Sequence, residues 1–156
     1  RVRSKVDRAL AAGLTPILCL GETEEDRRRG GSDDVLAWQV ATALAGQPAA
    51  RIPDVVLAYE PRWAIGSSDA ASPDYVAARH AALRALLRER YGAETARRTR
   101  ILYGGSVTPR NGPDLVAQDD VDGLFVGRAA WDPDGFGEIV AQVAEAARAK
   151  RVPSGV

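Results

Sequence analysis

Short apolar runs alternate with amphipathic stretches from one end of the chain to the other. Four of the apolar runs are four or five residues long and are apolar on both faces. This pattern is typical of strands that are buried within a parallel sheet. The predicted strands occupy residues 16–20, 55–59, 100–103 and 123–126.

Around these strands, apolar residues recur at helical spacing. The pattern predicts helices over 2–12 and 33–44, from 73 onward, over 111–117, and from 133 onward. Strands and helices thus alternate as four parallel β-α units, preceded by a helix. Two architectures fit: an open doubly wound sheet, or part of an eight-fold β/α barrel.

Residues at the helix ends support these boundaries. Gly13 suits the left-handed conformation that ends a helix, Ser32 is placed to cap the second helix, and Ser72 with Pro73 resembles a helix start. The last helix carries an apolar stripe of Phe136, Ile139, Val140 and Val143. Beyond it we expect a frayed tail over 151–156.

The charge balance limits the partners. The chain has 21 basic and 21 acidic residues, which argues against nucleic acid as the main partner. No apolar stretch reaches the ~20 residues that span a bilayer, so we expect no membrane partner. The single cysteine, Cys19, fits a reducing cytoplasm. No Cys/His cluster has metal-ligand spacing, and we expect no metal and no cofactor.

Glu60 is the first candidate for chemistry. It directly follows the strand at 55–59 and precedes Pro61, Trp63 and Ile65. Partial desolvation by these neighbours would make its carboxylate a better proton acceptor. The alternative is a solvated loop carboxylate.

The loop after Glu60 is the second candidate. Residues 61–71, called the lid below, form a connection of about eleven residues with an apolar stem and a small polar tip. Such a loop can close over a substrate and exclude water. The alternative is a flexible surface insertion, but Trp63 and Ile65 are poorly suited to permanent exposure.

Glycine-rich turns end two successive strands, at 103–106 and 126–128. Glycines let backbone N–H groups approach an anion, so the pair of turns indicates a phosphate cradle. The only histidine, His80, shares a helical stripe with Val76, Leu83 and Leu87 and is expected to pack rather than react. Cys19, inside an apolar strand, is also expected to pack.

The order and spacing of several motifs resemble the triosephosphate isomerase family. They are Ala58-Tyr59-Glu60-Pro61, Trp63-Ala64-Ile65-Gly66, Tyr103-Gly104-Gly105-Ser106, and Val121-Asp122-Gly123 followed by Val126-Gly127. Residues 13–17 and 19–23 agree as well. The resemblance covers essentially the whole chain and implies the C-terminal half of a (β/α)8 barrel, with strands 5 to 8 of the parent barrel in a single partial domain over 1–156.

The resemblance also implies roles for individual residues. Glu60 would be the base that moves a proton between adjacent carbons of a triose phosphate. The phosphate would be bound by Gly66, Ser106, Gly127 and Arg128. Pro61, Trp63, Tyr103, Glu22 and Cys19 would support the lid and the base: Tyr103 bracing the closed lid, Glu22 pairing with Trp63 in the open lid, and Cys19 packing beneath Glu60. The parent protein would be a cytoplasmic homodimer acting on a small sugar phosphate.

Some residues depart from the family pattern. Arg62, the lid tip with Asp69, and Arg128 in place of a second glycine suggest a divergent branch. Arg128 could clamp the phosphate or narrow the pocket. One alternative suggested by these departures is an isomerase of four-carbon ketose phosphates. Another alternative is a non-catalytic half-barrel that retains the phosphate cradle but lacks the chemistry.

The family's asparagine, lysine and catalytic histidine precede the matched region. The chain also has no methionine, and we expect it to be a piece of a longer protein that lacks the N-terminal half. By itself the chain should show little isomerase activity.

Overall fold

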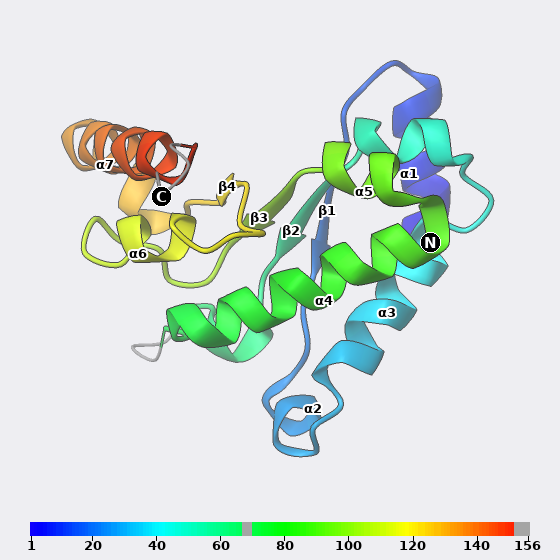
Figure 1. The fold of residues 1–156 in the computed structure, drawn as a ribbon, viewed down its shortest axis with the longest axis horizontal. Coiled ribbons are helices and arrows are strands. Elements are labelled where there is room, and N and C mark those ends of the chain that lie inside the picture. The colour runs from blue at the N-terminus through cyan, green and yellow to red at the C-terminus, as the bar shows by residue number, and fades with distance from the viewer. Residues whose placement is uncertain (67–69, 152–156) are drawn as a thin grey trace, which may run out of the picture.

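The computed structural model describes residues 1–66 and 70–151. Its centre is one parallel sheet with the strand order β1-β2-β3-β4, the same order as in the chain (Figure 1). The strands are β1 (Ile17–Leu20), β2 (Val56–Tyr59), β3 (Ile101–Tyr103) and β4 (Gly123–Leu124). Tyr59 is in register with Leu20 on one side and with Tyr103 on the other. The carboxyl ends of the first three strands are therefore level.

Seven α-helices alternate with these strands in the described residues. They are α1 (Val2–Ala11), α2 (Glu24–Arg28), α3 (Ser32–Ala43), α4 (Pro73–Tyr91), α5 (Ala93–Arg98), α6 (Gly112–Val116) and α7 (Pro133–Arg151). Three short 3-10 helices complete the structure: η1 (Ala49–Asp54), η2 (Arg62–Ala64) and η3 (Arg128–Ala130). The predicted succession of β-α units is confirmed, and it agrees with part of an eight-fold β/α barrel.

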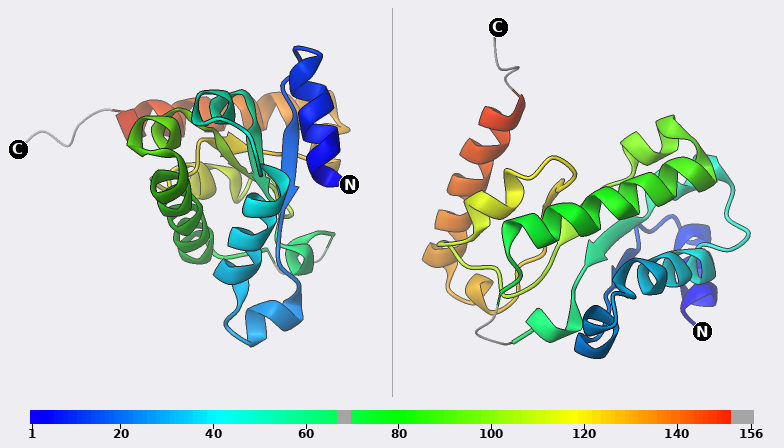
Figure 2. Two further views of the ribbon diagram at one scale, coloured as in Figure 1. Left: turned by 90° about the vertical axis from the view of Figure 1, so that its right-hand side faces the viewer. Right: turned by 60° about the horizontal axis from the view of Figure 1, so that its bottom comes forward.

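The core lies between the sheet and the helices α3 and α4, which cover one face of it (Figures 1 and 2). β2 is paired on both sides, and all four of its residues are buried. From α4, Val76, His80, Leu83 and Leu87 are buried in the same core. The expectation that His80 packs within a helical stripe is confirmed.

The expectation that every strand is buried on both faces is wrong for β1. Leu18 and Leu20 are buried, but Ile17 is 50% exposed and Cys19 is also exposed. The side chains of Ile17 and Cys19 point to the face opposite the helical cover, and β1 lies at an edge of the sheet. Cys19 is therefore not enclosed in the core as its apolar neighbours suggested.

The residues predicted to begin or end helices were only partly confirmed. Gly13 follows α1 with a φ of 72°, and the Ser72 hydroxyl caps α4 by accepting a hydrogen bond from the Tyr75 amide at 3.3 Å. The prediction for Ser32 is wrong, because Ser32 is the first residue of α3 and caps nothing. Its hydroxyl lies 3.1 Å from the Tyr75 hydroxyl instead.

The last two elements also differ from their predictions. β4 is two residues long, shorter than the predicted 123–126. On α7, Ile139 is buried whereas Phe136 and Val140 are 41% and 52% exposed, so only part of the apolar stripe is covered. The predicted frayed tail begins at Arg151, which belongs to α7, and its remaining residues lie outside the described part of the chain. No helix of the described residues is both long and apolar enough to cross a bilayer.

Candidate active site

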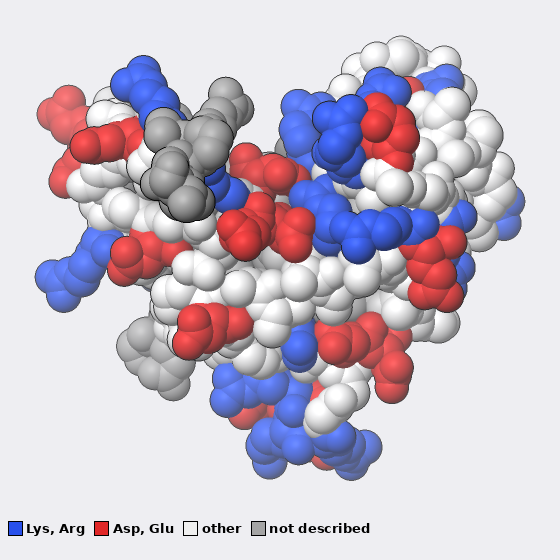
Figure 3. Space-filling view, in the orientation of Figure 1, with Lys and Arg blue, Asp and Glu red and all other residues white. Residues whose placement is uncertain are grey.

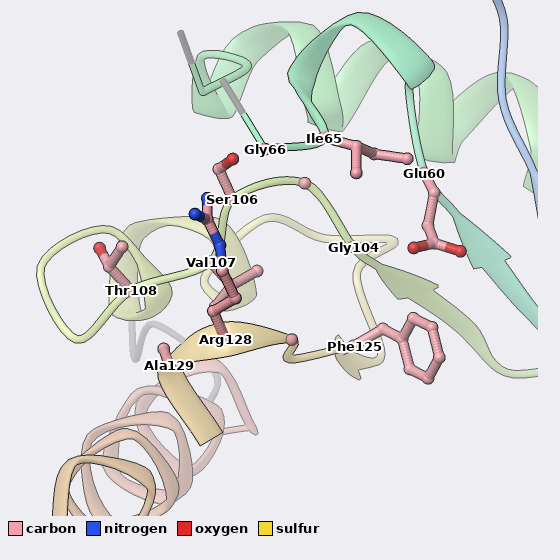
Figure 4. Close-up of a pocket in the computed structure, with 12 residues that line it drawn as sticks. Glu60, Ile65, Gly66, Gly104, Ser106, Val107, Thr108, Phe125, Arg128 and Ala129 are labelled. Atoms are coloured by element: carbon pink, nitrogen blue, oxygen red, sulfur yellow. The ribbon is translucent and has the colours of Figure 1, made fainter. Parts of the chain in front are cut away.

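A cavity of about 580 Å³ opens where the strands end (Figure 4). Its walls come from Glu60 after β2, from residues 104–108 after β3, and from Phe125 and residues 127–129 after β4. Ile65 and Gly66 of the lid stem close another side. The structure thus brings together Glu60, Gly66, Ser106, Gly127 and Arg128, all of which were predicted from sequence as site residues.

Glu60 is half-buried and points its carboxylate into the cavity (Figure 4). Its amide donates a hydrogen bond of 2.6 Å to the carbonyl of Leu20, which ties Glu60 to the end of β1. A Cβ atom on Gly104 would lie 2.9 Å from Cγ of Glu60 and 3.2 Å from Phe125. Glycine at position 104 is therefore needed for the Glu60 side chain to pass into the cavity.

Cys19 lies beside Glu60, as the resemblance implied. Partial burial of the thiol, together with a hydrogen bond to the Glu60 carboxylate and its charge, raises the thiol pKa to about 11. The thiol is therefore protonated near neutral pH, which disfavours a role as a nucleophile.

Glu22 and Trp63 lie in contact, and their role in an open lid stays a prediction. Glu22 is fully buried, and its carboxylate accepts a hydrogen bond of 2.9 Å from the indole Nε1 of Trp63. The hydroxyl groups of Tyr59 and Tyr75 donate two further contacts, at 3.0 Å and 2.8 Å. Burial first, and then the Glu22 charge, raises the pKa of Tyr59, so that its hydroxyl remains a donor. Sequence reasoning missed both tyrosines.

Arg27 completes this cluster from outside. Its guanidinium lies 4.1 Å from the centre of the Trp63 ring, which is a cation–π arrangement. The Tyr75 ring meets Trp63 edge to face at 5.4 Å. The stem of the lid is therefore held by both polar and aromatic contacts. Pro61, the first residue of the lid, is buried.

Ser106 links the two sides of the cavity. Its hydroxyl donates a hydrogen bond of 2.7 Å to the carbonyl of Ala64, in the lid stem. Its φ of 48° lies in the left-handed region, which is rare for a residue with a side chain, and Asn111 donates a 3.1 Å hydrogen bond to its carbonyl. The hydrogen bonds to Ala64 and from Asn111 help to hold the Ser106 backbone in this unfavourable conformation.

Tyr103 is buried below this turn, and its hydroxyl donates to the carbonyl of Gly105 at 3.1 Å. Burial raises its pKa to about 12, against an opposing hydrogen bond from the backbone of Ala71. Ala71 is the last residue of the lid, so Tyr103 contacts one end of it. The role of Tyr103 in a closed lid stays a prediction.

Several of the residues that line the cavity are glycines, Gly66 and Gly127 among them. A Cβ atom on Gly66 or Gly127 would meet no atom within 4 Å, so the protein leaves space beside both. Arg128 extends from η3 into the cavity (Figure 4). Phe125, Val107 and Thr108 also line it, and no sequence motif singled them out. The lid tip with Asp69 lies outside the described residues, and the part that is described holds no group of three or more potential metal ligands.

Comparison with known proteins gives one consistent match. A family model described as triosephosphate isomerase matches residues 1–143. The triosephosphate isomerase of Solibacter usitatus is 45% identical over 139 residues, which are 89% of this chain and 56% of the relative. That of Symbiobacterium thermophilum is 46% identical over 145 residues, 93% of this chain and 57% of the relative. That of Roseiflexus castenholzii is 47% identical over 139 residues. The chain thus spans little more than half the length of these curated relatives.

Proposed function

The chain belongs to the triosephosphate isomerase family, and from this premise we propose that the protein containing it interconverts glyceraldehyde 3-phosphate and dihydroxyacetone phosphate. The observation that carries the proposal is the cavity that holds Glu60 opposite a glycine-lined wall. A base and an anion cradle in one cavity suit a small substrate with a phosphate at one end and an exchangeable C–H bond at the other.

Glu60 would remove a proton from the carbon next to the carbonyl and return it to the neighbouring carbon. Developing charge on the carbonyl oxygen needs an electrophilic partner. This chain has only one histidine, and His80 is buried with its Nδ1 3.0 Å from the carbonyl of Asp120. The electrophile must therefore come from other groups, and the 156-residue chain tested by itself should show little turnover.

The backbone N–H groups of Gly66, Gly127 and their neighbours would bind the phosphate. The hydrogen bond between Trp63 and Glu22 holds the lid stem. This bond would break as the lid closes over the substrate and excludes water. No step in this scheme uses a cofactor or a metal.

Glu60→Asp in the full-length protein tests the proposal. Shortening the side chain by one methylene withdraws the base from the substrate carbon, so kcat should fall by about 100-fold or more while the affinity for inorganic phosphate stays unchanged. The exposed Asp74→Glu, on the first turn of α4, is the matched control. Equal loss of kcat and phosphate affinity would contradict the role of Glu60.

Arg62, Asp69 and Arg128 depart from the family pattern, and these departures suggest a second candidate, an isomerase of four-carbon ketose phosphates. The ratio of kcat/KM for three- and four-carbon substrates, measured on the full-length protein, decides between the two. Turnover of neither, with phosphate binding retained, would favour a non-catalytic phosphate-binding protein instead.

We also propose that the full-length protein is a cytoplasmic homodimer. The family resemblance supports the dimer, and the exposed free thiol of Cys19 suits a reducing compartment. Sedimentation of the full-length protein at equilibrium tests the dimer, and a fractionated cell lysate tests the location.

A further inference from the structure

Two opposite charges lie in the cavity, one on each side. Among the described residues that line it, Glu60 is the one acidic side chain and Arg128 is the one basic side chain. Figure 4 shows the Arg128 side chain extending from η3 toward the turn of Ser106, while the Glu60 carboxylate enters from the side of β2. A substrate between them would have one end at a cation and the other end at a base.

The guanidinium of Arg128 is not engaged by an acidic side chain. No ion pair joins Arg128 to an Asp or Glu in the described part of the chain, and the residue is exposed. Arg84, by contrast, contacts both Asp120 and Asp122. An anion that enters the cavity can therefore contact Arg128 without displacing an existing ion pair.

We propose that the Arg128 side chain binds the substrate phosphate directly and selects phosphorylated substrates over neutral ones; this inference rests on the proposed function. The planar guanidinium can donate two parallel N–H groups to two phosphate oxygens, which is its favoured geometry with such groups. The backbone N–H groups of Gly66 and Gly127 offer dipoles, but Arg128 adds a full positive charge. The phosphate then lies at the Arg128 end, and the reacting carbons lie toward Glu60.

A competing outcome has a clear physical basis. A long side chain at position 128 could occupy the space beside Gly66 and Gly127 that the phosphate needs, and removing it would then improve binding. The sign of the effect on phosphate affinity separates the two cases.

The test is calorimetric titration of inorganic phosphate into the full-length protein and its variants. Loss of a charge-assisted bidentate contact in Arg128→Gln should weaken phosphate binding on the order of 10-fold. Arg128→Lys keeps the positive charge but loses the two parallel N–H donors of the guanidinium, and it should weaken phosphate binding about 3-fold. Arg110→Gln is the matched control, because Arg110 is exposed in the loop after Thr108 but does not line the cavity. It makes the same change in net charge and should stay within about 2-fold of the wild type.

Kinetics provide the second readout. In Arg128→Gln the KM for glyceraldehyde 3-phosphate should rise on the order of 10-fold, with kcat changed little, because the contact is made in ground state and transition state alike. Turnover of unphosphorylated glyceraldehyde should not change.

Phosphate affinity in Arg128→Gln that equals or exceeds that of Arg110→Gln overturns the inference, as does a wild type that binds no phosphate. If the wild type binds phosphate through Arg128 but does not isomerise triose phosphates, the proposed function fails and the anion site stands.

Discussion

The indole Nε1 of Trp63 donates a hydrogen bond of 2.9 Å to the fully buried carboxylate of Glu22. This contact joins the lid stem to the segment after β1, across 41 residues of sequence. Because Tyr59 and Tyr75 donate to the same carboxylate, Glu22 is the shared acceptor of three donors from three segments. These three hydrogen bonds compensate for burial of the Glu22 charge.

Trp63→Phe removes one of these donors and keeps an aromatic ring. We expect the free energy of unfolding to fall by about 2 kcal/mol, because a buried carboxylate loses a hydrogen bond that water cannot replace. Urea denaturation of the full-length protein measures this. The matched control is Trp38→Phe, at a side chain that is 67% exposed, where the change should stay under about 0.5 kcal/mol. Equal effects of the two substitutions would show that the Glu22 contact contributes no stability.

We expect His80 to make the fold sensitive to mild acid. Burial lowers its pKa from 6.5 to about 4, against the opposing influence of the Asp120 carbonyl and the charges of Asp122 and Asp120. The folded state keeps His80 neutral, whereas the unfolded state takes up a proton below pH 6.5. The stability that comes from keeping His80 neutral is thus fully present above pH 6.5. It is lost as the pH falls toward about 4.

The measurement is the free energy of unfolding of the wild type and of His80→Gln as a function of pH. From pH 6.5 down to about pH 5, the wild type should lose about 1.5 kcal/mol more than the variant does. Parallel pH profiles for the two proteins would mean that His80 is protonated equally in both states.

The elements of the sheet could be predicted because buried parallel strands require apolar residues on both faces and end in glycine or polar turns. Glu60 and the turns at 103–106 and 126–128 stood out by their place after such strands. The helix α5 was missed because its sequence is mostly polar, with Ala96 as its one buried residue.

The Glu22 cluster could only be half predicted. Family resemblance paired Glu22 with Trp63, but Tyr75 is 53 residues from Glu22 and reaches it through the packing of α4. The same packing draws Ser32 to the Tyr75 hydroxyl and away from a capping role. The partner of each hydroxyl group depends on how the helices pack against the sheet. The periodicity of the sequence does not encode this packing.

Arg84 is a second buried charge whose removal should be costly. It contacts Asp120 at 3.1 Å and Asp122 at 2.6 Å, and it donates to the carbonyl of Thr99 at 2.6 Å. Arg84→Met should lower the free energy of unfolding by about 3 kcal/mol, since these acceptors lose their partner. Arg97→Met is the control, because its ion pair with Glu94 is solvent-exposed and should contribute under about 1 kcal/mol. A difference between the two that falls within experimental error would contradict the prediction.

Gly104→Ala tests how closely Glu60, the proposed base, is positioned. A Cβ atom at this site would lie 2.9 Å from Cγ of Glu60, so the carboxylate must rotate or shift away from its place in the cavity. Because catalysis is sensitive to misplacements of this size, kcat of the full-length protein should fall about 100-fold, while binding of inorganic phosphate near Arg128 is retained. The control is Gly137→Ala on α7, where a Cβ atom would meet nothing within 4 Å and kcat should not change. Unaltered kcat in Gly104→Ala would mean that the position of Glu60 seen here is not the one from which it reacts.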